Sequence, residues 1–292
     1  MIIAALAPQR VTQRPAFVPG FFARGRAYGI VGAEFASPSS SGTADPMLAI
    51  LGRRLLSFLL CSPLLILALP AAHAQSAAQL DHAYQSELQA ENDALRARIQ
   101  QLPPAMQELN SQISAALRAG NRPEAQRVAE EMARLDPRNA DVRLFLGKLH
   151  AQQGDLPAAQ DRFDQAIKLN PDNKWAYVNK AGTQAERSDL PNALATTREL
   201  TARFPGWSIG YNLQASLLDA MDRKSEALDA YQKAVRAQPA SALILTNQGN
   251  LLRRMGRLPD ARLSYEDALR IQPGYALAES ALADLPNAPG KP

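Results

Sequence analysis

Prolines recur in this chain at a strict interval of 34 residues. They stand at Pro137, Pro171, Pro205, Pro239 and Pro273. Two further columns keep the same register: Ala125, Ala159, Ala193, Ala227 and Ala261, and Pro123, Pro157, Pro191 and Pro259. Self-similarity at a fixed period of this length is typical of arrays in which one supersecondary unit stacks on the next. The period therefore predicts a repeat array.

Each column has a mechanical role. The segments GNRPEA, GDLPAA, SDLPNA and GRLPDA place a turn residue before a proline that suits the first position of a helix. Small residues on the preceding helix and aromatic residues on the following helix allow two helices to approach closely. The small residues are Gly147, Ala181, Ala215 and Gly249, and the aromatic residues are Phe163, Tyr231 and Tyr265. The closing proline of each unit ends its second helix.

This order of small, aromatic and proline positions resembles the tetratricopeptide repeat. The resemblance implies an all-α fold, a right-handed superhelical solenoid of helix-turn-helix units preceded by a single long helix. Five units are expected, followed by a capping helix to about residue 284 and a flexible tail at 285–292. The units cover 106–139, 140–173, 174–207, 208–241 and 242–275. The first unit departs from the pattern with Ile113 and Ala129, and the third with Thr197 and Leu200.

The N-terminal part of the chain has the features of an export leader. From Met47, Arg53 and Arg54 precede an apolar run that ends in an A-x-A exit at Ala74, which is the pattern of a cleaved secretory signal peptide. We therefore expect a signal peptide at 47–74 and a periplasmic or secreted bacterial protein without a stable membrane anchor. Residues 1–46 show no helix or strand period, and we expect them to be disordered or not translated.

Charge and composition exclude several functions. The chain has 32 Lys and Arg against 28 Asp and Glu, and the basic excess lies in residues 1–74, which disfavours nucleic-acid binding by the remainder. The single cysteine, Cys61, also lies in the leader, so the remainder has no thiolate nucleophile or zinc ligand. His150 is expected to be a core or partly buried residue. We expect no catalytic residue, cofactor or metal site.

Residues 75–104 form a separate segment. Residues 77–102 lack Gly and Pro, which favours one uninterrupted helix. Its heptad spacing predicts a short coiled coil and a possible homo-oligomer, with the seam at Leu88, Asn92, Leu95, Ile99 and Leu102. The alternative is an amphipathic helix folded against the first repeat.

A partner site is expected on the concave wall, which the first helix of each unit forms in such arrays. The groove positions known for the family fall here on Lys148, Trp175, Asn179, Asn212, Asn247, Asn250, Arg253 and Arg254. Asparagine amides donate and accept hydrogen bonds, which suits the backbone of an extended peptide. We expect these side chains to be exposed in the free protein. Solvated polar residues without a ligand are the alternative.

Two functions fit these observations. The first is an exported, non-catalytic scaffold that binds a peptide segment or partner protein in the cell envelope. Its layout resembles that of periplasmic proteins that combine a coiled coil with tetratricopeptide repeats. The second is an envelope enzyme that modifies cell wall or sugars, or a non-catalytic targeting subunit of such an enzyme.

The leader generates a direct test. If the signal peptide is cleaved after Ala74, N-terminal sequencing of the protein isolated from cells should give a chain that begins at Gln75. A product that begins at Met1, or one that stays in the cytoplasm, would exclude export.

Overall fold

A computed structural model describes residues 80–237 and 240–286. Within these ranges the elements are twelve α-helices, and none of them is long and apolar enough to cross a membrane. The expected 1–46 segment, the expected signal peptide at 47–74 and the end of the tail lie outside the described residues. The expectation of an all-α solenoid preceded by a long helix is confirmed.

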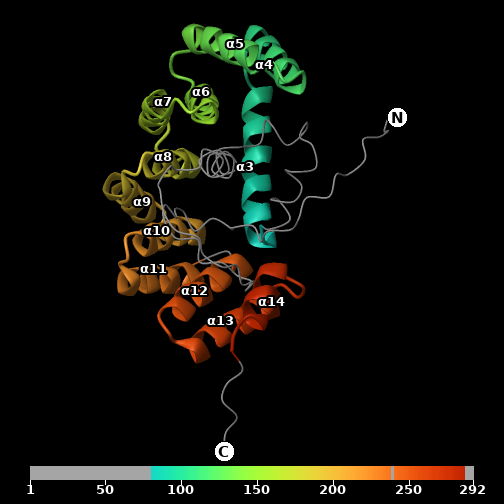
Figure 1. Ribbon diagram of the computed structural model, residues 1–292. Coiled ribbons are helices and arrows are strands. Elements are labelled where there is room, and N and C mark those ends of the chain that lie inside the picture. The colour runs from blue at the N-terminus through green and yellow to red at the C-terminus, as the bar shows by residue number, and fades with distance from the viewer. Residues whose placement is uncertain (1–79, 238–239, 287–292) are drawn as a thin grey trace, which may run out of the picture.

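The repeats form five helix pairs and a closing helix, which follow one another along an arc (Figure 1). The long helix α3 (His82–Gln100) precedes them. The pairs are α4 (Pro104–Arg118) with α5 (Arg122–Leu135), α6 (Ala140–Gln153) with α7 (Leu156–Leu169), α8 (Lys174–Glu186) with α9 (Leu190–Arg203), α10 (Ser208–Ala220) with α11 (Lys224–Arg236), and α12 (Ala242–Arg254) with α13 (Leu258–Ile271). The array ends with α14 (Ala276–Ala283).

Side chains at the turns start the second helices. Asn121 caps α5 by accepting a hydrogen bond from the backbone N–H of Glu124, and Asp155 and Asp189 cap α7 and α9 in the same way. The proline follows at the second helical position rather than the expected first, as at Pro123. Proline costs no helical hydrogen bond at this position, because the N–H groups of the first turn have no partner within the helix.

In the helix pairs that follow the repeat pattern, a small residue on the first helix faces an aromatic ring on the second. A Cβ atom at Gly147 would lie 2.5 Å from the ring of Phe163, and one at Gly249 would lie 2.5 Å from the ring of Tyr265. Both rings are fully buried. The absence of a side chain on the first helix therefore makes the space that the aromatic residue of the second helix fills.

The first unit reverses this arrangement. Ile113 on α4 is large, Ala129 on α5 is small, and both are buried in one apolar cluster. The third unit keeps Ala181 small but places Thr197 and Leu200 in the fully buried positions of α9. Its Thr196 hydroxyl donates to the side-chain oxygen of Gln184 on α8. The departures from the repeat pattern therefore keep the cores of both units filled.

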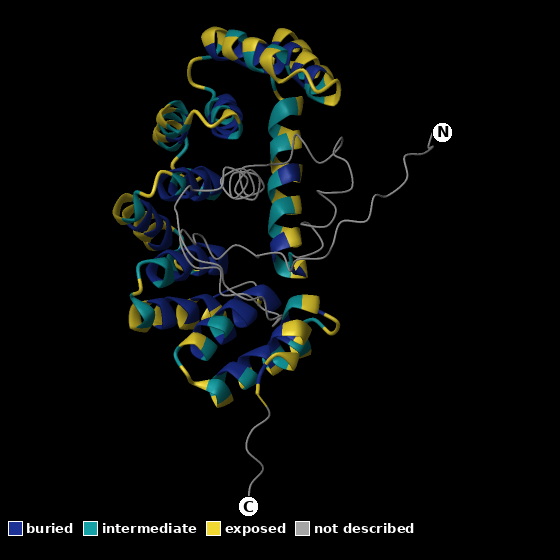
Figure 2. Ribbon diagram, in the orientation of Figure 1, coloured by how far each residue is buried: buried dark blue, intermediate teal, exposed yellow. Residues whose placement is uncertain are grey.

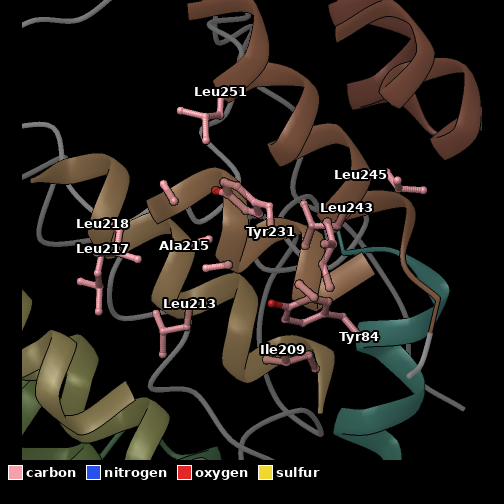
Figure 3. Packing of buried hydrophobic residues seen from close by; sticks show 14 of the residues in the cluster. Tyr84, Ile209, Leu213, Ala215, Leu217, Leu218, Tyr231, Leu243, Leu245 and Leu251 are labelled. Atoms are coloured by element: carbon pink, nitrogen blue, oxygen red, sulfur yellow. The ribbon is translucent and has the colours of Figure 1, made fainter. Parts of the chain in front are cut away.

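Helix α3 crosses the inner side of the arc. Figure 1 shows it running from beside α4 and α5 at one end of the array to α12 and α14 at the other. In Figure 2 the array helices carry most of the buried surface, and α3 shows short buried patches separated by exposed ones. Its Tyr84 is buried in the apolar cluster of units three to five, near Ile209 and Leu243 (Figure 3).

The proposed coiled-coil seam lies on the face of α3 that contacts the array. Leu88 packs against the apolar cluster that contains Tyr84, and Asn92 is buried. The structure thus has the packed-helix arrangement, although the helix lies along units two to five and not against the first repeat alone. Oligomerisation through 77–102 stays a prediction, and it requires this face to leave the array.

The glycine contacts predict a clear stability change. Gly147→Ala should lower the free energy of unfolding by about 1–3 kcal/mol, because the new methyl group overlaps the Phe163 ring. This loss should exceed the roughly 1 kcal/mol that alanine gains over glycine in a helix. Urea unfolding followed by circular dichroism measures it. Gly206→Ala is the control, since a Cβ atom there has no neighbour within 4 Å. Equal stability of the two variants would contradict the packing described.

Candidate partner-binding groove

The concave side of the array holds α3 through contacts that follow the order of the repeats in reverse. As α3 runs forward, its polar contacts pass from unit five through units four and three to unit two. Its 19 residues span about 28 Å at the rise of an α-helix. The groove therefore accommodates one straight helix across four units.

Asp81 joins the start of α3 to the start of α12. One carboxylate oxygen accepts from the backbone N–H of Tyr84 at 3.0 Å and caps α3. The other accepts from the Ser241 hydroxyl at 2.6 Å and the Leu243 backbone N–H at 3.0 Å. Asp81 is only 1% exposed. Free N–H groups and the dipole at a helix N-terminus stabilise a carboxylate, and here two helices share one.

One turn further along α3, Tyr84 ends a chain of side-chain amides. Asn247 donates to the Asn212 oxygen at 3.1 Å, and the Asn212 nitrogen donates to the Tyr84 hydroxyl at 2.9 Å. Burial, and then the charge of Asp81, raise the pKa of Tyr84 above its usual value. The phenol therefore stays neutral at physiological pH and keeps its place in this chain.

Glu87 lies beside an aromatic and cationic hollow in unit three. Its carboxylate accepts from the indole N–H of Trp207 at 2.8 Å and lies 3.9 Å from the Lys174 ammonium. The Lys174 ammonium also lies 5.1 Å from the centre of the Trp207 ring and 5.8 Å from that of Phe204. The hollow, of about 520 Å³, is bordered by Glu87, Lys174 and the 203–207 segment. Its chemistry suits a carboxylate next to an apolar surface.

The far end of α3 is held by charge. Arg98 makes a two-pronged contact with Asp141 in the first turn of α6, at 2.7 and 3.0 Å, and also pairs with Glu91 of its own helix. The side chains of Arg98 and Asp141 are 39% and 25% exposed. Solvent screens such a pair, so it positions the helix end more than it stabilises the fold.

The predicted groove residues are less accessible than expected. Lys148, Trp175, Asn179, Asn212 and Asn247 are buried, and the expectation that they are exposed is wrong. Asn179 donates to the Trp175 carbonyl of its own helix at 2.6 Å. The rings of Trp175 and Trp207 pack edge to face, with centroids 5.5 Å apart.

The three remaining predicted residues lie at the end of α12. Asn250 is half-buried and accepts from the Tyr265 hydroxyl at 2.9 Å, so it serves the packing of unit five. Arg254 is exposed and forms an ion pair with Asp219 of the neighbouring unit. Arg253 is half-buried. Among the predicted residues, Asn212 is the one whose side chain donates a hydrogen bond to Tyr84 of α3, and Asn247 supports it from behind.

Sequence reasoning missed the residues that hold α3. In the sequence, Asp81, Tyr84 and Glu87 stand out only as part of a helix, and Ser241 only as the end of a unit. A signal was present: Asp81, Tyr84 and Glu87 recur at intervals of three residues, so they share one helical face. Nothing in the sequence, however, indicated that this face meets the first helices of units four and five.

The described part of the chain holds no cluster of metal ligands. In residues 80–237 and 240–286, no three His, Cys, Asp or Glu side chains are placed to hold a metal ion. His150 lies partly buried at the end of α6, with its Nδ1 3.7 Å from an Asp155 oxygen. The concave side of the array offers hydrogen-bond donors and aromatic surface, which suit the binding of a partner.

Comparison with known proteins agrees with the fold. The chain resembles MamA of Desulfovibrio magneticus RS-1, solved from residue 41 to its end, with 22% identity and a TM-score of 0.50 over 59% of this chain and 99% of that chain. It also resembles yeast Tom70, with 22% identity and a TM-score of 0.52, over 61% of this chain and 39% of that one. No curated protein matches it in sequence.

Family models match the array itself. One model described as a tetratricopeptide repeat matches residues 116–166, and a second model with the same description matches 146–206 and 212–276. Together they cover more than half of the 292 residues. Proteins of this kind typically serve as scaffolds for protein interactions. The five helix pairs, their 34-residue period and these matches show that the chain belongs to the tetratricopeptide repeat family.

Proposed function

We propose that this protein is an exported, non-catalytic scaffold of the cell envelope that binds a helical segment of a partner protein on its concave side. The observation that carries the proposal is the position of α3. A helix of the chain itself lies along the inner wall and forms hydrogen bonds with units four and five. The wall therefore has the shape and the donors for a helix, and an extended peptide is no longer the favoured ligand.

The leader supports the location. Arg53, Arg54, the apolar run and the A-x-A exit at Ala74 are the reason to place the protein outside the cytoplasm. The array supplies the binding surface, because each unit contributes its first helix to a continuous inner wall. We propose binding and no reaction, because the donors of this wall, Ser241, Asn212 and Trp207, serve to hold a helix.

Site-specific photocrosslinking in cells tests this function. A benzophenone side chain in place of Lys174 should crosslink the protein to another envelope protein, because Lys174 borders the hollow beside α3. The same side chain at Leu263 is the control, since Leu263 is 58% exposed on a second helix. Mass spectrometry identifies the product. Capture at 263 but not at 174 would exclude the groove, and a product confined to the cytoplasm would exclude the envelope.

A further inference from the structure

The groove presents a row of hydrogen-bond donors to α3. They come from three neighbouring units: the Leu243 N–H of unit five, the Asn212 amide and the terminal Ser241 hydroxyl of unit four, and the indole of Trp207 and the ammonium of Lys174 in unit three. Each of them meets an oxygen atom on α3 or on Asp81, the residue that caps it. Two of the three oxygen-bearing groups are carboxylates and the third is a phenol.

These donors are costly to leave without acceptors. Ser241, Asn212 and Trp207 are each no more than 5% exposed. A buried donor that loses its acceptor loses the compensation for its desolvation. A ligand that replaces α3 must therefore supply oxygen atoms at the same places, and an apolar helix of similar shape would bind poorly.

The spacing of the oxygen atoms defines a pattern. Asp81, Tyr84 and Glu87 lie three residues apart, so one helical face presents a carboxylate, a hydroxyl on an aromatic ring, and a second carboxylate. The ring of Tyr84 also enters the apolar cluster, near Ile209 and Leu243 (Figure 3). The groove therefore distinguishes a ligand by charge, by shape and by the interval between its polar groups.

We propose that the groove selects a helix of another protein that carries this acid, aromatic hydroxyl and acid pattern at intervals of three residues, and that α3 is a tethered competitor for the same site. This inference rests on the proposed function and names the class of partner. Complementary charge supports it: the α12 N-terminus and Lys174 receive the two carboxylates.

The connection between α3 and the array suits a competitor. Only residues 101–103 separate α3 from α4, and they include Pro103. A helix held on so short a tether has a high effective concentration, on the order of millimolar, at its own groove. A free ligand therefore has to overcome α3, and weakening the contacts of α3 should increase the affinity of the groove for that ligand.

A synthetic peptide of residues 80–101 provides the probe. Its binding is measured by fluorescence anisotropy to the chain from Gln75 onward, and to a variant of that chain with Asp81→Ser, Tyr84→Phe and Glu87→Gln. Serine keeps a helix cap while removing the second carboxylate oxygen. The variant chain should bind the peptide at least about tenfold more tightly, because its α3 loses the hydrogen bonds of the second Asp81 oxygen and the Tyr84 hydroxyl, and the charge of Glu87 beside Lys174. Each lost hydrogen bond counts for roughly a factor of five.

Matched peptides test the pattern. The peptide with the same three substitutions should bind the variant chain at least about tenfold more weakly than the unmodified peptide. A peptide with Ser86→Ala and Gln89→Ala should bind like the unmodified one, since both side chains are exposed on α3. Release of α3 has its own signal: the chain has two tryptophans, and the emission of Trp207 should shift to the red in the variant.

Each contrary result overturns the inference. If the unmodified and triply substituted peptides bind equally well, the groove does not recognise the proposed pattern. An unshifted tryptophan emission together with unchanged peptide affinity would show that these contacts do not hold α3. A dimeric wild-type chain by light scattering would make a second copy the occupant. If the peptides fail while crosslinking at position 174 still captures an envelope protein, the scaffold function stands and only the partner class is wrong.

Discussion

The fit of a large side chain on one helix against a small one on the other is the constraint on which this structure depends. Gly147 has no room for a methyl group beside Phe163, and Gly249 has none beside Tyr265. Close approach within each pair fixes how one unit stacks on the next, and a small rotation repeated along an array gives a curved wall. The curvature creates an inner side wide enough for α3. The binding surface is therefore a consequence of packing that occurs elsewhere.

The inner wall gains its specificity from polar groups placed where helices begin. Asp81 links the first turns of α3 and α12, and Glu87 reaches the indole that precedes α10. Helix N-termini offer unpaired N–H groups and partial positive charge, so a stack of them along one side favours acidic ligands. The apolar contacts of the Tyr84 ring strengthen the binding of α3 but do not fix the direction in which the helix runs. Together these contacts let the array hold one helix in one orientation and one register.

The sequence was sufficient to predict the repeats and insufficient to predict the groove. A strict period constrains local structure, since each turn, cap and small residue acts within its own unit, and for this reason the solenoid was predicted correctly. The exposure of Asn212 and Asn247 was predicted incorrectly. Their burial depends on α3, a helix more than a hundred residues away in the chain. The same heptad-like face of α3 suits a coiled coil and a groove. Apolar spacing alone does not distinguish a partner in another chain from one in the same chain.

Helix α3 lies on the concave side with its first turn against unit five, and the groove contacts depend on this placement. A disulfide between Asp81→Cys and Ser241→Cys tests it most directly, because the Ser241 hydroxyl donates to the Asp81 carboxylate at 2.6 Å and the two side chains are therefore neighbours. Mild oxidation of the chain from Gln75 onward should give an intramolecular bond between these positions. The pair of Ser86→Cys with Ser241→Cys should give none, since Ser86 is exposed on α3. No bond between 81 and 241, or a bond that joins only separate chains, would contradict this placement of α3.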